Sequence, residues 1–357
     1  MARGGAGGVS VMTTTHGSLR NSLATAKPDA SAAQLLQMLV RSGLDQLPAP
    51  SGGATRVRWQ SLAAVAEFDL SLVKLYEGHT DALAILKELS GPPAVSGVDT
   101  WGMWAAESPQ GHTLLEPADD GRVRLVGRKC WCSGADHLSH GLLTAWYADG
   151  TGPQLVRVAM RQPGIAIDAS HWQSVGMAGS VSVDVVFDGA VGDLVGQPGA
   201  YLTRPGFWQG GAGIAACWYG GARAIAAALR GQPVPGLITA TSMGGHHPFR
   251  LAALGKVDLA LQATAAVLRD AASWIDDHPL HDASQVTLRA RLQAEACANT
   301  VLLEAGRSLG ASAFCRDARF ARAAADLPVF IRQSHAERDF AALGERVSAS
   351  GEDPWLL

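Results

Sequence analysis

Hydrophobic positions change their spacing twice along the chain. Apolar residues recur every three or four positions in Ser31–Ser42 and in Trp59–Leu89, the spacing of one face of a helix. Between Gly97 and about Gly199 the period shortens to two, as in Val181–Phe187, where valines alternate with serine and aspartate. The helical spacing then returns for the rest of the chain. The pattern therefore predicts helices, then a sheet, then helices again.

These changes in spacing divide the chain into four predicted parts. A flexible tail rich in Gly, Ser and Thr covers residues 1–30, and a helical domain covers 31–96, beginning at Asp29 or Ser31 as the helix cap. A central antiparallel β domain covers 97–199. A C-terminal bundle of about four helices covers 200–357. The bundle helices are expected over residues 211–230, 249–276, 284–309 and about 323–343. The fold class is α+β.

Composition narrows the class of protein. Of 357 residues, 47% are hydrophobic and 17% charged, which is typical of a folded globular chain. A net charge of -3 supports neither a nucleic-acid partner nor a membrane surface. The uncharged stretch Pro205–Ala222 holds six glycines and is expected to be a buried helix rather than a membrane span. The five cysteines are odd in number, which favours a reduced, cytoplasmic compartment.

The segment Gly127-Arg-Lys-Cys-Trp-Cys-Ser-Gly-Ala135 is the strongest candidate for chemistry. It places a flat aromatic side chain, Trp131, two residues before a small hydroxyl donor, Ser133, in a strand-like region. A planar heterocycle such as a flavin ring needs that kind of surface. The alternative interpretation makes Trp131 a core aromatic residue and Ser133 a turn residue.

This segment and three others resemble the acyl-CoA dehydrogenase superfamily, which shares the order of helices, sheet and bundle. Ala105–Gly111 is similar to that family's Thr-Glu-Pro-x-x-Gly, and residues 127–135 are similar to its Gly-x-Lys-x-Trp-x-Thr/Ser-x-Ala. Trp172–Ser180 resembles its Gly-Met-x-Gly-Ser strand entry, and Val183–Phe187 its Val-x-Val-x-Phe. The four matches occur in the family's order, and together with weaker matches in the bundle the resemblance covers roughly residues 30–345.

The resemblance implies FAD held between the β domain and the bundle. Trp131 and Ser133 would then lie on the isoalloxazine ring, with the backbone of Ala105, Ala106 and Glu107 near its pyrimidine edge. Phe249 would belong to the segment that reaches the FAD phosphates. The resemblance also implies a homodimer or homotetramer built on the bundle.

This sequence departs from the family's pattern at the catalytic base. The family's dehydrogenases remove a proton with a carboxylate, but Ser334 stands where the family's glutamate is expected, followed by His335. The second usual position lies within Pro205–Leu229, which contains no Asp or Glu. We expect His335 to transfer the proton, with Ser334 beside it and Asp339 orienting it as an i+4 helical neighbour. One alternative is a carboxylate base from elsewhere in the chain, with Glu337 and Asp339 on the same predicted helix. Another is an exposed charged helix face formed by His335, Glu337, Arg338 and Asp339.

Two further segments bear on the flavin. The family carries an arginine for the FAD phosphates where this chain reads His246-His247, so Arg250 or Lys256 is expected to compensate. Tyr76–Asp81 places a glutamate, a histidine and an aspartate close together. Those residues are expected on a helix surface, the alternative being that Glu77 or His79 lines the flavin pocket.

Other kinds of site find little support. Cys130 and Cys132, even with His137 and His140, lack the second cysteine pair of a structural zinc site, so no metal is expected. The sequence contains no P-loop and no Gly-x-Ser-x-Gly elbow, and no Gly-x-Gly-x-x-Gly follows a strand.

The function expected from the sequence is therefore an FAD-dependent oxidoreductase acting on CH–CH groups. Its substrate would be an acyl-CoA, oxidised between the α and β carbons. The alternatives are a reduced-flavin-dependent monooxygenase of the same fold, or a non-catalytic relative that is flavin-binding or structural.

Overall fold

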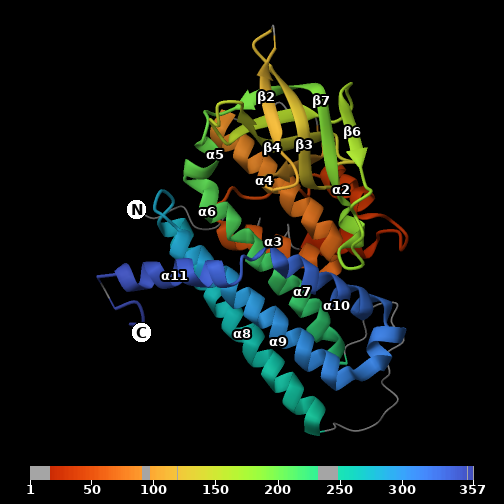
Figure 1. Ribbon diagram of the computed structural model, residues 1–357. Helices are drawn as coiled ribbons and strands as arrows, with labels where there is room; N and C mark the ends of the chain where they lie inside the picture. The colour runs from red at the N-terminus through yellow and green to blue at the C-terminus, as the bar shows by residue number, and fades with distance from the viewer. Residues whose placement is uncertain (1–16, 91–96, 119, 232–247, 352, 357) are drawn as a thin grey trace, which may run out of the picture. The chain divides into compact units, whose positions relative to one another are not determined.

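A computed structural model describes residues 17–90, 97–118, 120–231, 248–351 and 353–356 (Figure 1). It divides into two compact units. Unit 1 holds the described residues of Met1–Pro50, Ser71–Ser174 and Ala178–Phe207, and unit 2 those of Ser51–Leu70, Val175–Met177 and Trp208–Leu357. The division differs from the expected one, because residues 51–70 belong with the C-terminal bundle rather than with the first helices.

Unit 1 contains the helices α2 (Ala32–Arg41), nearly all of α4 (Leu70–Ser90) and the short α5 (Ala200–Thr203). Ser31 caps α2: its hydroxyl accepts from the Gln34 N–H, and the Gln34 side chain accepts from the Ser31 N–H. Residues 17–24 are also helical, with Leu19 and Leu23 buried. The expectation of a flexible tail is therefore wrong for this stretch, since two leucines four positions apart give it an apolar face.

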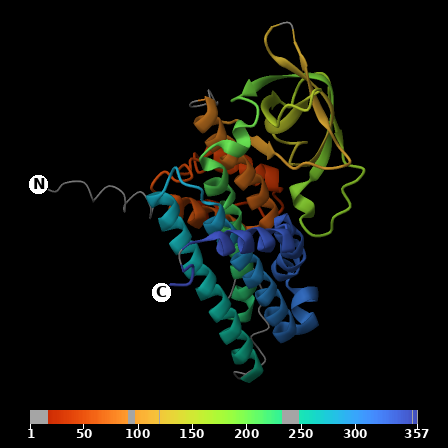
Figure 2. The same cartoon turned by 60° about the vertical axis from the view of Figure 1, so that its left-hand side comes forward.

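The strands of unit 1 form a seven-stranded sheet (Figure 2). Their order is β1-β4-β2-β3-β7-β5, with β6 on β7. β4 also pairs with β5, so five strands form a closed ring of pairings. The strands are β1 (Trp101–Trp104), β2 (Thr113–Pro117), β3 (Val123–Ser133), β4 (His140–Tyr147), β5 (Gln154–Ala159), β6 (Ile165–Asp168) and β7 (Ser182–Val195).

The sheet is mixed, whereas an antiparallel sheet was expected. β2 and β4 are parallel, because both run opposite to β3 and they pair with each other. β1 is also parallel to β4. One end of the sheet packs on α4, whose Ala82, Ile85 and Leu86 share a core with residues of four strands. The strand residues of that core are Trp101, Leu142, Leu155 and Val195.

Unit 2 is helical. Its elements are α3 (Thr55–Phe68), α7 (Gly213–Leu229), α8 (Pro248–Asp277), α9 (Ser284–Arg316), α10 (Ala318–Phe330), the 3-10 turn η2 (Ile331–Gln333) and α11 (Glu337–Ala349). The short α6 (Gly206–Gly211) spans the boundary between the units. α8 and α9 run side by side in both views (Figures 1 and 2). α3 packs on α7, where a Cβ at Gly220 would clash with the carbonyl of Ala63. The glycines of α7 therefore allow close backbone approach.

The last bundle helix is interrupted, whereas one helix over residues 323–343 was expected. α10 ends at Phe330, and α11 begins only at Glu337. Between them Ala336 has a left-handed φ of 47°, which a helix does not permit. Between Ile331 and Phe340 the only apolar residue is Ala336, so the apolar spacing is interrupted where the helix breaks.

Among the residues that the structure describes, two helical segments are long and apolar enough to span a membrane by length and composition: Gly206–Leu229 and Pro248–Asp277. In the first, 72% of the apolar window is buried, as expected for a core helix. In the second only 22% is buried, because α8 leaves one face open. That no membrane is involved stays an expectation from the sequence.

One carboxylate near the end of α8 caps α3. Asp276 accepts hydrogen bonds from the Thr55 N–H at 2.9 Å, the Thr55 Oγ1 at 2.6 Å and the Gly53 N–H at 3.1 Å. The N-cap residue itself, Ala54, offers no side-chain acceptor. Asp276 thus satisfies the first N–H groups of α3 from another helix.

Substituting Asp276→Ala is expected to lower the free energy of unfolding by about 1.5–3 kcal/mol, the usual contribution of a hydrogen bond to a charged group. Urea denaturation of the variant and of Asp277→Ala, which alters the neighbouring exposed carboxylate, measures the difference. Equal losses in the two variants would contradict this role of Asp276.

A second buried carboxylate holds the loop before β7. Asp326 on α10 is 3% exposed and accepts the Met177 N–H. A Cβ on the preceding Gly176 would clash with the Ala325 carbonyl, so the loop lies directly on the helix. Burial raises the pKa of the Asp326 carboxyl above its ordinary value, an effect only partly offset by the Met177 hydrogen bond.

This raised pKa predicts a pH dependence of stability. The unfolded chain loses its Asp326 proton first, so stability falls as pH rises from 3.8 toward the raised folded value. Asp326→Asn removes that contribution. The free energy of unfolding measured across this range is therefore expected to fall less steeply with pH in the variant, and identical slopes would contradict the assignment.

Candidate functional site

The backbone of β3 turns Trp131 outward. The pairing of β3 with β7 shifts register between Lys129 and Cys132, as in a β-bulge, and Trp131 has a left-handed φ of 63°. The flanking Cys130 and Cys132 are buried, whereas Trp131 is 56% exposed. A bulky residue at positive φ is strained, and such strain clusters at functional sites. The interpretation of Trp131 as a core aromatic residue is therefore wrong.

Ser133 ends the same strand and joins a chain of hydroxyl groups. Its Oγ lies 2.7 Å from the Oγ of Ser182, its register partner on β7, and the Ser182 Oγ lies 3.0 Å from that of Ser180. The Trp104 indole N–H donates to the Ser133 carbonyl at 3.2 Å. Ser133 is thus a fixed strand residue rather than a turn residue, and its hydroxyl belongs to a hydrogen-bonded series.

A buried lysine ties the loop after β1 to β3. Lys129 is 2% exposed, and its Nζ donates to the Glu107 Oε1 at 3.0 Å and to the Thr144 Oγ1 at 2.7 Å. The Thr144 hydroxyl in turn donates to the Glu107 Oε1 at 2.6 Å. Ala105 is half-buried, and Ala106 and Glu107 are exposed. The structure therefore links this loop to the strand that carries Trp131 and Ser133.

The start of β1 is anchored by the cluster expected on a helix surface. That expectation is wrong, since Tyr76 and His79 are buried. His79 accepts the Trp101 N–H on Nδ1 at 3.1 Å, and its Nε2 lies 3.1 Å from the Asp45 Oδ2. Because Nδ1 accepts, Nε2 carries the ring hydrogen and donates to Asp45. This network fixes the strand that leads into Ala105.

These residues of unit 1 fit one face of a flavin. An exposed indole covers an aromatic ring, and a hydroxyl series offers a donor to a ring nitrogen. Exposed loop backbone offers further N–H groups to ring carbonyls. The ion pair between Lys129 and Glu107 was not expected from the sequence, and His79 was considered only as a residue lining the pocket, not as an anchor of β1. Their signals in the sequence were only a lysine two residues before Trp131 and a histidine within an apolar helix.

Ser334, His335 and Asp339 come together in unit 2. His335 precedes α11 rather than lying on a helix, yet its Nδ1 is 3.2 Å from the Asp339 Oδ1. The His335 N–H donates to the other carboxylate oxygen at 3.2 Å, and the Ser334 Oγ accepts the Ala336 N–H at 3.2 Å. The expected pairing with Asp339 is therefore present, although the chain folds back to make it instead of following a helical face.

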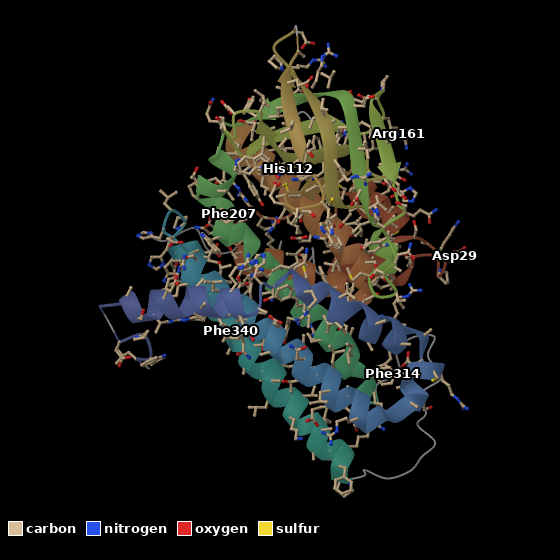
Figure 3. All side chains as sticks on the ribbon, viewed as in Figure 1. Asp29, His112, Arg161, Phe207, Phe314 and Phe340 are labelled. Atoms are coloured by element: carbon tan, nitrogen blue, oxygen red, sulfur yellow. The ribbon has the colours of Figure 1, made fainter. Side chains whose placement is uncertain are left out.

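The alternative of an exposed charged face holds for part of this segment. The side chain of His335 is 62% exposed, and Glu337 and Arg338 are exposed as well. Asp339, however, is only 8% exposed, while its neighbour Phe340 (Figure 3) is 55% exposed. The cluster therefore pairs a fixed, buried carboxylate with an accessible imidazole.

Phe249, at the start of α8, is 78% exposed and belongs to unit 2. The two cations expected to compensate nearby are both engaged. Arg250 donates to the Leu229 carbonyl at the end of α7, and Lys256 pairs with Glu304 at 2.9 Å. His246 and His247 lie outside the described residues.

The described residues contain no group of three or more His, Cys, Asp or Glu arranged to hold a metal ion. Cys130 and Cys132 are buried free thiols. Burial raises the pKa of both thiols, which disfavours the thiolate that binds metals.

Comparison with known proteins gives three kinds of result. No family profile matches the sequence. One curated protein, amino sugar nitrososynthase DnmZ of Streptomyces peucetius, is 35% identical over 88 residues, which are 24% of this chain and 22% of DnmZ. The match thus spans less than a quarter of either protein.

Solved structures match over nearly the whole chain. TdsC of Paenibacillus sp. A11-2, in complex with FMN and indole, has a TM-score of 0.75 at 20% identity, covering 97% of this chain and 98% of TdsC. KijD3, in complex with FMN and a dTDP-linked amino sugar, has a TM-score of 0.74 at 18% identity, and the match covers 97% of this chain and 94% of KijD3. Butyryl-CoA dehydrogenase of Megasphaera elsdenii has a TM-score of 0.75 at 15% identity, and the match covers 98% of this chain and 100% of the dehydrogenase. The comparisons confirm the resemblance at the level of the fold.

Lys129→Met tests whether the lysine fixes the loop. The variant leaves Glu107 with Thr144 alone, so the backbone amides of residues 105–107 are expected to exchange hydrogen faster, in step with a loss of ~1–3 kcal/mol in local stability. Hydrogen exchange followed by mass spectrometry measures this. Arg124→Gln, an exposed cation on the same strand, serves as the control. Unchanged exchange in Lys129→Met would exclude the role.

Proposed function

The chain has the acyl-CoA dehydrogenase fold, and from that premise we propose that it is a flavin-dependent oxidoreductase. The observation that carries the proposal is Trp131, a large aromatic residue held 56% exposed by a strained bulge in β3. Ser133 and the loop Ala105–Glu107 supply polar groups fixed to the same strand.

The sequence motifs and the similar structures point to different forms of flavin. The sequence motifs imply FAD, whereas TdsC and KijD3 are both described with FMN. Trp131 and Ser133 address the ring, which the two forms share. We therefore propose a flavin at this site, and the form released on denaturation identifies which one the chain prefers.

The catalytic groups favour oxygenation over dehydrogenation. Removal of a proton α to a thioester needs a carboxylate, but Ser334 occupies one family position and Pro205–Leu229 contains no acid at the other. In their place stands an accessible imidazole, His335, ordered by Asp339. We propose a reduced-flavin-dependent monooxygenase in which His335 accepts a proton from the substrate.

A reduced flavin bound at this site would supply two electrons to O2, so that one oxygen atom would be added to the substrate and the other released as water. Trp131 would orient the ring by stacking, and the Ser133 hydroxyl would hold its polar edge. His335 receives the substrate proton on Nε2, because Nδ1 faces Asp339.

For the substrate we propose a small molecule with an oxidisable nitrogen, such as the amine of a nucleotide-linked sugar. The local similarity to an amino sugar nitrososynthase and the fold shared with KijD3 support this class. The second candidate remains acyl-CoA dehydrogenation, which the full-length similarity to butyryl-CoA dehydrogenase favours.

Assembly and location are proposed on separate grounds. A homodimer or homotetramer is implied by the sequence resemblance, and α8 exposes Phe249 and Leu259. A cytoplasmic location rests on the five free cysteines, four of which are buried.

The flavin site is tested by Trp131→Ala. Flavin affinity is expected to fall roughly tenfold, because an aromatic stacking pair contributes up to ~1.5 kcal/mol beyond the area it buries. Titration with FAD and FMN, followed by flavin fluorescence, measures the dissociation constants. The control is Trp355→Ala, which removes a tryptophan that is 81% exposed. Equal affinity in both variants would contradict the assignment.

The reaction is tested on the reconstituted protein. With NADH, a flavin reductase and oxygen, the proposal predicts a hydroxylated or further oxidised amine from a dTDP-amino sugar. Bleaching of the oxidised flavin by acyl-CoA without oxygen would instead establish the dehydrogenase. A protein that binds neither flavin would be the non-catalytic relative.

A further inference from the structure

Two residues of α9 hold the turn that precedes His335. Arg291 and Glu295 are four positions apart and therefore lie on one face of the helix. The Arg291 Nη2 donates to the Gln333 carbonyl at 3.0 Å, and the Glu295 Oε1 accepts from the Arg332 Nη2 at 2.8 Å. Both residues of η2 that lead into Ser334 are thus fixed to α9.

Arg291 also reaches the carboxylate that orders His335. Its Nη2 lies 3.8 Å from the Asp339 Oδ2, the oxygen that accepts the His335 N–H. The other oxygen, Oδ1, is 3.2 Å from the His335 Nδ1. Arg291 therefore contacts the chain on both sides of His335, through the Gln333 carbonyl before it and the Asp339 carboxylate after it.

The guanidinium group itself is held in place. It lies over the indole of Trp218, with the Arg291 Cζ 5.7 Å from the ring centroid. Trp218 is fully buried in α7, and the Arg291 side chain is 17% exposed. A cation held over a buried aromatic face has a restricted orientation, which suits a group that donates to one acceptor and forms an ion pair with a second.

The contacts of Arg291 and Glu295 explain how the backbone beside His335 keeps a strained conformation. Ala336 has φ 47° and ψ -118°, outside the regions that a residue with a Cβ prefers. Such a conformation persists only where its surroundings over-determine it. Here Ser334 accepts the Ala336 N–H, and Asp339 accepts the His335 N–H, while α9 fixes the two preceding residues.

The same contacts determine where the imidazole carries its hydrogen. An ionised carboxylate only accepts hydrogen bonds, so the Nδ1 that faces Asp339 must be the donor. In the neutral ring the lone pair is then on Nε2. The side chain is 62% exposed, so this lone pair belongs to an accessible group.

We propose that Arg291 is a positioning residue for His335. By holding Asp339 and the Gln333 carbonyl together, it selects the Nδ1–H form of the imidazole and presents Nε2 as the proton acceptor. Its effect on turnover rests on the proposed monooxygenase function. Its effect on the ring hydrogen does not, because the contacts involved lie within unit 2.

The test reads the imidazole directly, without flavin. Long-range 1H–15N NMR spectra of histidine-labelled protein distinguish the two neutral forms of the ring, and the signal absent from His335→Gln identifies His335. Wild-type protein at neutral pH is expected to show the Nδ1–H form. The Nε2–H form in the wild type would overturn the proposal.

Arg291→Met is expected to shift His335 toward the Nε2–H form, and Arg291→Lys, which keeps one donor cation, is expected to shift it less. Arg307→Gln, an exposed arginine on the same helix, is the control and is expected to leave the signal unchanged. A His335 signal that is identical in Arg291→Met and in wild type would overturn the proposal. If Arg291→Met does not fold, Arg291→Lys and the wild type still decide it.

Turnover supplies the second measurement. In the active enzyme Arg291→Met is expected to lower kcat by up to roughly 10²-fold, as for a catalytic group displaced by about 1 Å, with KM little changed. An altered imidazole form with unaltered kcat keeps the positioning role and removes His335 from the reaction. That outcome rejects the proposed function of His335 and leaves the structural inference standing.

Discussion

The bulge at Lys129–Cys132 is the constraint on which the candidate flavin surface depends. One irregular step in the pairing of β3 with β7 sends Trp131 out of the sheet while its two cysteine neighbours stay buried. Lys129, the last paired residue before this step, is buried and binds Glu107 and Thr144. The exposed aromatic face and the contacts that fix the adjacent loop therefore lie on the same short stretch of β3.

In unit 2, hydrogen bonds and ion pairs fix the orientation of the exposed candidate residue His335. His335 lies in a break between two helices, a place where a side chain is ordinarily mobile. Here the break is fixed by a carboxylate inside α11 and by two charged residues of α9, so that an exposed imidazole acquires a defined orientation. Strained, left-handed backbone thus occurs at Trp131 in unit 1 and at Ala336, next to His335, in unit 2.

The sequence predicted which segments are helices and which are strands, but it did not predict the bulge in β3 or the break between α10 and α11. Period-two spacing located β3 and β7, and the motif around Trp131 identified the fold. Neither reveals a left-handed tryptophan, since the bulge arises from register with a distant strand. The break at Ser334 was missed although the sequence signals it, since Ala336 is the only apolar residue between Ile331 and Phe340. Arg291 was missed because its role depends on Asp339, 48 positions further along the chain, which only tertiary packing brings close.

The most direct test of the account is an experimental structure of the protein reconstituted with FMN or FAD. The account predicts the isoalloxazine ring against the indole of Trp131, with the Ser133 hydroxyl at hydrogen-bond distance from its polar edge. A flavin bound elsewhere, with Trp131 still open to solvent, would contradict it.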